Sequence, residues 1–132
     1  MHDMKDFVTI TMSGTEYPLF CSMEVLSQIQ DEFGDWVKFI EKLLPDASER
    51  PAGFMPDIHA LIFSLPKLVN EGIESYNVGR PIEERIDPIP ARRVFLICDQ
   101  PVITVVSLIK DAVLRSIIPP KEEPHAESLA QD

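Results

Sequence analysis

Glycine, histidine and cysteine are scarce in this sequence, and no long apolar run is present, so several classes of protein are excluded at once. The five glycines are scattered and form neither a phosphate-cradling loop nor a dinucleotide fingerprint. The three histidines lie in different segments, and neither a His-x-x-x-His nor a Cys-x-x-Cys spacing predicts a metal site. No window reaches the roughly 20 apolar residues that a membrane span requires. We therefore expect no cofactor, no bound metal and no membrane partner.

Basic residues are also in the minority. Aspartate and glutamate total 22 against 12 lysine and arginine, which gives a net charge of −10. Such a chain repels a phosphate backbone, so nucleic acid is a poor partner. Cys21 and Cys98 lie far apart among apolar neighbours, as buried free thiols in a reducing compartment do. Because the N-terminus lacks a basic segment followed by an apolar core, we expect the protein in the cytoplasm.

The length of 132 residues and the 45% apolar content predict one domain with one core. We place this domain at residues 1–118. From residue 119 the composition turns to proline, glutamate and other polar residues, which predicts a flexible acidic tail over 119–132. A charged segment with three prolines, residues 80–90, reads as an extended or disordered connection.

The predicted fold class is mainly α with a short N-terminal β-hairpin, in a small helical bundle. A β-rich run turns at Ser13-Gly14 and returns through Pro18, which predicts a hairpin over residues 6–20. Pro18 cannot donate to a strand ladder, so its strand should be brief or lie at an edge.

Apolar residues then recur at steps of three and four, which predicts helices over about 22–34, 35–44, 56–78 and 101–117. Ser22 and Asp35 are the expected caps of the first two. Pro66 falls inside the third pattern, and we expect it to kink or break that helix near residues 63–65. The apolar run over 91–100 is compatible with either helix or strand.

Candidate catalytic groups are weak. The neighbouring carboxylates Asp31 and Glu32, like Glu83 and Glu84, sit among other charges at expected surface positions, which favours solvated faces over an acid–base pair. His59 reads as a helix-surface residue. We expect no catalytic residues and no enzyme activity.

Three segments follow one another in a distinctive order. Residues 8–19 form a short strand and a Gly-x-Glu-Tyr-Pro-Leu return, residues 25–34 form a helix that ends in Glu-Phe-Gly, and residues 61–77 form a central helix. In this order and spacing the chain resembles the tail assembly chaperones of long-tailed phages and prophages, over roughly residues 6–80. An uninterrupted central helix would be expected from this family, and Pro66 departs from that pattern.

The resemblance implies a non-catalytic function in the bacterial host cytoplasm during virion assembly. The protein would bind the tape measure protein, keep its apolar helical surface from aggregating, and help to recruit the tail tube protein. Aromatic residues carry much of the energy at protein interfaces, so Trp36, Phe39, Phe63 and Tyr76 are the candidate protein-binding residues. Association into a homo-oligomer is also open, because an apolar helix face can pack against its own copy.

Two other functions remain open at this level. One is a bacterial helical adaptor or regulatory protein-binding module with no phage role. The other is a small enzyme with a distributed site, which would require a deep pocket lined by convergent polar groups.

Overall fold

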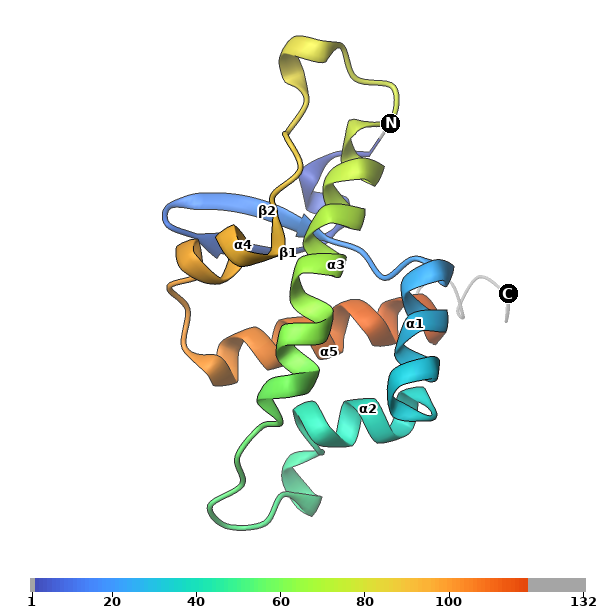
Figure 1. Ribbon diagram of the computed structural model, residues 1–132, viewed down its shortest axis with the longest axis vertical. Helices are drawn as coiled ribbons and strands as arrows, with labels where there is room; N and C mark the ends of the chain where they lie inside the picture. Colours follow the sequence, from blue (N-terminus) through green and yellow to red (C-terminus); the bar gives the residue numbers. More distant parts are fainter. Residues whose placement is uncertain (1, 119–132) are drawn as a thin grey trace, which may run out of the picture.

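The computed structural model describes residues 2–118, and the expected tail over 119–132 lies outside the described residues. The described part is mostly helical and begins with an antiparallel hairpin, so the predicted fold class is confirmed. In Figure 1 the long helix α3 stands upright at the centre, with the hairpin crossing it and the other helices arranged around it.

The hairpin consists of β1 (Val8–Met12) and β2 (Thr15–Leu19), joined by the turn that the sequence predicted. Ser13 and Gly14 both have positive φ, 51° and 82°, which matches the tight turn whose twist suits a two-residue hairpin loop. Pro18 lies opposite Thr9 in this two-stranded sheet. A sheet of two strands leaves each strand one unpaired side, so the missing N–H of Pro18 is tolerated.

Two short helices follow, α1 (Met23–Phe33) and α2 (Trp36–Leu43), within one residue of the predicted bounds. The Ser22 hydroxyl accepts from the Val25 amide at 3.2 Å, and the Asp35 carboxylate accepts from the Lys38 amide at 2.7 Å. Both expected caps are thus confirmed, and each satisfies a donor that the first turn of a helix leaves free.

The central helix α3 (Ile58–Asn77) continues through Pro66 as one helix. Of the kink or break that the sequence predicted near residues 63–65, the break is therefore wrong. A proline inside a helix costs about 3 kcal/mol because it removes one hydrogen bond and crowds the preceding turn. Here α3 packs against β2 and against all the other helices of the described chain, and burial of its apolar face offsets that cost.

The last two helices are α4 (Ala91–Ile97) and α5 (Val102–Ile117). The sequence left helix and strand open for residues 91–100, and the structure shows a helix, α4, over the first seven of them. None of the helices in the described part of the chain combines the length and the apolarity that crossing a bilayer requires.

One core joins all these elements. Its fully buried large side chains come from the hairpin, from α1 to α5, and from no separate cluster; they are Ile10, Met12, Ile29, Phe39, Leu43, Leu65, Leu68, Val69, Ile73, Val94, Val106 and Ile109. This shared core agrees with the single domain that the sequence predicted.

The hairpin approaches α3 very closely at Gly72. A methyl group at this position would stand 2.1 Å from the carbonyl oxygen of Pro18, so only glycine fits there. Just beyond, the Phe20 amide donates to the Leu68 carbonyl at 3.1 Å. The hairpin and the second half of α3 are therefore joined backbone to backbone.

Residues 80–90, here named the strap, run back along the same half of α3. The Asn70 side chain exchanges two hydrogen bonds with the Ile89 backbone, at 2.7 and 2.8 Å, and Asn77 exchanges two with the Ile86 backbone, both at 2.9 Å. Asn70 and Asn77 are seven residues apart, which is about 10 Å along a helix. Ile86 and Ile89 are three residues apart, which is also about 10 Å along an extended chain, so both amides meet their backbone partners. The strap is ordered by these pairs, and the disordered alternative for this segment is wrong.

Candidate functional site

The four aromatic residues that the sequence put forward occupy three separate places. Phe39 is fully buried in the core, so it belongs to the interior of the fold and not to a contact surface. Trp36, Phe63 and Tyr76 are each half-buried. Trp36 lies at the start of α2, Phe63 in the first half of α3 and Tyr76 in the last turn of α3.

Phe63 belongs to an aromatic cluster where α1, α2 and α3 meet. The ring of Phe33 lies 5.1 Å from that of Phe39 and 5.4 Å from that of Phe63, measured between centroids. The His59 ring lies 5.6 Å from Phe33. Aromatic pairs at such separations are favourable beyond the area they bury. The cluster therefore fixes the position of α1 against the first half of α3.

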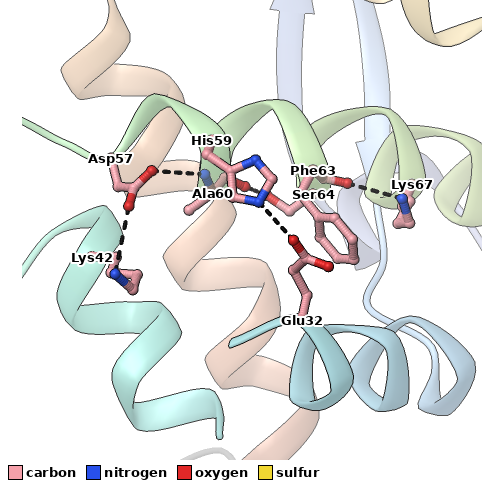
Figure 2. Close-up of polar contacts among 8 residues, drawn as sticks. All are labelled: Glu32, Lys42, Asp57, His59, Ala60, Phe63, Ser64 and Lys67. Carbon is pink, nitrogen blue, oxygen red and sulfur yellow. Dashed lines mark hydrogen bonds and ion pairs between the residues drawn. The ribbon is translucent and has the colours of Figure 1, made fainter. Parts of the chain in front are cut away.

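Figure 2 shows polar contacts of the first half of α3 with α1 and α2, beside His59 and Phe63 of this cluster. The Glu32 carboxylate on α1 lies 2.7 Å from Nε2 of His59 on α3, and Lys42 on α2 lies 3.7 Å from the Asp57 carboxylate that caps α3. His59 is exposed on the helix surface, as predicted. These contacts join three helices at their exposed rims.

Lys67 is held against Phe63. Its ammonium group lies 4.0 Å from the centre of the Phe63 ring and donates to the Phe63 carbonyl at 3.2 Å. A cation over an aromatic face is stabilised by the quadrupole of the ring. The positive charge of Lys67 is therefore already engaged within the chain.

A groove of about 400 Å³ lies along α3 beside this cluster. Helix α1 forms one wall, α3 forms the floor, and the first residue of α4 closes one end. Its lining combines apolar side chains with carboxylates and amides; the residues are Glu24, Val25, Gln28, Ile62, Phe63, Pro66, Lys67, Asn70, Glu71 and Ala91.

An apolar strip continues from this groove toward the start of α3. Met55 is 77% exposed, Ile58 is 45% exposed and Ile62 is 51% exposed. Ile58, Ile62 and Pro66 are spaced four residues apart, so they lie on one face of the helix. We name Ile58 and Ile62 the α3 strip. It leaves large apolar side chains in contact with water, which is uncommon for contiguous residues unless they bind something.

Trp36 lies at a different hollow, of about 230 Å³, between α2 and α5. Leu114 and Lys110 of α5 line it together with Trp36 and Ile40. Lys110 also donates to the Leu44 carbonyl at 3.0 Å and so ties α5 to the end of α2. The sequence interpretation treated Trp36 and Phe63 as equivalent, and the structure separates them.

Tyr76 is covered by the chain itself. The guanidinium of Arg80 lies 3.7 Å from the centre of the Tyr76 ring, and the Phe7 ring lies 6.5 Å away. Arg80 also donates to the backbone carbonyls of Tyr76 and His2. Tyr76 thus anchors the N-terminus and the strap to α3.

Sequence reasoning missed the residues that shape the groove. Ile62 was counted in the apolar face of α3 and Pro66 was treated only as a helix breaker. The signal that distinguishes Ile62 from its neighbours is its position four residues before Pro66, on the same face. Lys67 gave no signal, because its contact with Phe63 depends on the helix continuing past the proline.

The chemistry of ionisable groups is modest. Within residues 2–118 no three His, Cys, Asp or Glu side chains gather closely enough to hold a metal ion. Both cysteines are free thiols, Cys21 buried and Cys98 half-buried. Burial, with a smaller contribution from the charge of Glu71, raises the pKa of Cys21 from 9.0 to about 11. This thiol is protonated at neutral pH, which makes it a poor nucleophile.

Comparison of the chain with protein-family models, with curated proteins and with solved structures finds no significant match.

Proposed function

We propose that this chain is a non-catalytic tail assembly chaperone, which binds the tape measure protein and helps to recruit tail tube subunits during virion assembly. The observation that carries the proposal is the α3 strip, which stays exposed beside an open groove although the chain has a complete core elsewhere. The order of hairpin, short helix and long central helix, on which the family resemblance depends, supports it.

The physical requirements of such a chaperone agree with this surface. A protein that shields another chain needs apolar area for that chain and a charged exterior that keeps it dispersed while the area is open. The α3 strip supplies the apolar area. The net charge of −10 supplies mutual repulsion between copies of the chaperone.

Co-expression tests the proposal directly. The chain, carrying an affinity tag, is expressed together with the tape measure protein encoded in the same tail-gene cluster, and the soluble fraction is purified through the tag. We expect the tape measure protein to be retained with the chaperone and to precipitate when it is expressed alone. An unrelated tagged protein of similar size and charge is the control.

Loss of the tape measure protein during this purification, or its equal solubility with the control protein, contradicts the proposal. Gene order gives a second test. A tape measure gene close downstream is expected for a tail assembly chaperone, whereas a bacterial adaptor has no reason to lie beside one.

A further inference from the structure

The lining of the groove along α3 carries more carboxylates than cations. Glu24 and Glu71 bring carboxylates to its lining, and Gln28 adds an amide. The one cation in the lining, Lys67, is engaged with the ring and the carbonyl of Phe63. A ligand with positive charge is therefore favoured.

Pro66 adds another acceptor. In a helix the carbonyl of residue 62 accepts from the amide of residue 66, and proline has no amide hydrogen. The Ile62 carbonyl consequently lacks its usual partner, and both Ile62 and Pro66 line the groove.

We propose that this groove binds an amphipathic α-helical segment of another protein, which presents apolar residues to the α3 strip and lysine or arginine toward the α1 wall. This inference rests on the proposed function, in which the tape measure protein would supply such a segment. Charge complementarity with Glu24 selects the basic flank, and the exposed Ile58 and Ile62 select the apolar face.

A helical ligand fits better than an extended one because of its backbone. An extended segment buried here would need partners for its own N–H and C=O groups, and the two helical walls satisfy their backbone groups internally apart from the Ile62 carbonyl. A helical ligand has already formed its backbone hydrogen bonds within itself before it binds. The groove runs from Ile62 to Glu71, about 14 Å along α3, which corresponds to between two and three helical turns.

The other half of α3 shows how the same helix is covered when the chain supplies the cover itself. There the strap is bound through Asn70 and Asn77. Asn70 also lines the groove, so the open surface continues directly from the face that the strap occupies. The groove is the uncovered continuation of an interface that already exists within the fold.

Two synthetic amphipathic helices test the inference on the full chain. They share one apolar face, and they carry lysine in one peptide and glutamate in the other on the polar face. Binding is measured by fluorescence anisotropy. We expect the lysine peptide to bind and the glutamate peptide to bind at least about tenfold more weakly, since opposed like charges are destabilising across an interface.

Matched variants locate the binding. Ile62→Asp should weaken the lysine peptide by about tenfold or more, as expected for a central apolar contact, and Glu24→Lys by about threefold. Ile82→Asp and Glu83→Lys make the same changes on the strap, where Ile82 is 79% exposed, and should leave binding unchanged. Circular dichroism spectra confirm that each variant is folded.

Equal binding of the two peptides, or equal effects of Ile62→Asp and Ile82→Asp, overturns the inference. Retention of the tape measure protein by the Ile62→Asp variant at the wild-type level also overturns it while leaving the proposed function intact. Specific binding of the lysine peptide in the groove supports the inference even where the tape measure protein is not retained, and in that case only the proposed function fails.

Discussion

Both halves of α3 bury apolar side chains, but the large apolar side chains that stay exposed on this helix, Ile58 and Ile62, both lie in its first half. The second half is covered by the hairpin at Gly72 and by the strap at Asn70 and Asn77. The first half leaves the α3 strip exposed beside the groove. Figure 1 shows this difference, with the hairpin and the yellow strap beside the upper part of the helix.

The second half of α3 contributes mainly to the stability of the fold, whereas the exposed face of the first half is available for binding. Contacts in the covered half are made by backbone atoms at Gly72 and Phe20 and by the paired amides of Asn70 and Asn77. Contacts in the open half include exposed side-chain pairs such as Glu32 with His59, and such pairs contribute little to the free energy of unfolding because solvent screens them. Substitutions in the covered half should therefore change the free energy of unfolding, and substitutions in the open half should change binding.

A large effect on stability is expected for Gly72→Ala. The added methyl group would lie 2.1 Å from the Pro18 carbonyl oxygen and 2.5 Å from its carbon, so the hairpin must move away from α3. We expect a loss of about 3 kcal/mol in stability by denaturant unfolding, although alanine is the better helix former.

Gly14→Ala is the matched control, because no atom lies within 4 Å of the added group and only the positive φ of 82° opposes it. Its cost should be about 1–2 kcal/mol. Equal losses for the two variants would mean that the close approach at Gly72 contributes nothing.

The next effect is expected at the strap. Asn70→Ala leaves the backbone of the buried Ile89 without its two partners, which should cost about 2 kcal/mol. Asn77→Ala removes the same bonds from the half-buried Ile86 and should cost about 1 kcal/mol. Hydrogen exchange of the Ile89 and Ile86 amides measures the loosening residue by residue.

Asn70→Asp sharpens this prediction, because a carboxylate still accepts from the Ile89 amide but no longer donates to the Ile89 and Pro66 carbonyls. It should protect the Ile89 amide better than alanine does. Unchanged exchange in all three variants would show that the strap is held by other contacts.

A pH effect is expected at Cys21, which lies near Glu71 of the covered half. The folded pKa of about 11 exceeds the ordinary 9.0, so the folded state keeps a proton that the unfolded state loses in this interval. The contribution of Cys21 is therefore fully present below pH 9 and declines as the pH rises toward 11, by about 1.4 kcal/mol per pH unit.

Urea unfolding of the wild type and of Cys21→Ala between pH 8 and pH 11 isolates this slope from other titrating groups. The difference in stability between the two proteins should shrink as the pH rises. A difference in stability that stays constant with pH would show that the pKa of the Cys21 thiol is not raised by folding.

Local signals in the sequence predicted most of the elements of the fold. The turn at Ser13-Gly14 and the caps at Ser22 and Asp35 depend on residues a few positions apart, so they could be recognised without tertiary information. Pro66 could not be judged in this way. Its cost is local, but the packing that offsets it comes from distant parts of the chain.

The candidate site was predicted less well, because exposure is decided by packing. Periodicity placed Ile62 and Ile73 in one apolar pattern, and only the fold shows that the first is exposed and the second buried. Phe39 was selected for its aromatic ring although it lies in the core. The bonds of Asn70 and Asn77 to the strap join residues 19 and 9 positions apart, which no helical pattern reveals.

The smallest effect on stability is expected for Ile62→Ala, and it tests the division of α3 most directly. Ile62 is 51% exposed, so removal of its side chain should cost less than about 1 kcal/mol. Ile73→Ala makes the same chemical change in the covered half, where the side chain is 1% exposed, and should cost about 2–5 kcal/mol. Thermal unfolding of both variants gives the comparison. If Ile62→Ala destabilises the protein as much as Ile73→Ala does, the α3 strip is part of the core and is not available to a partner.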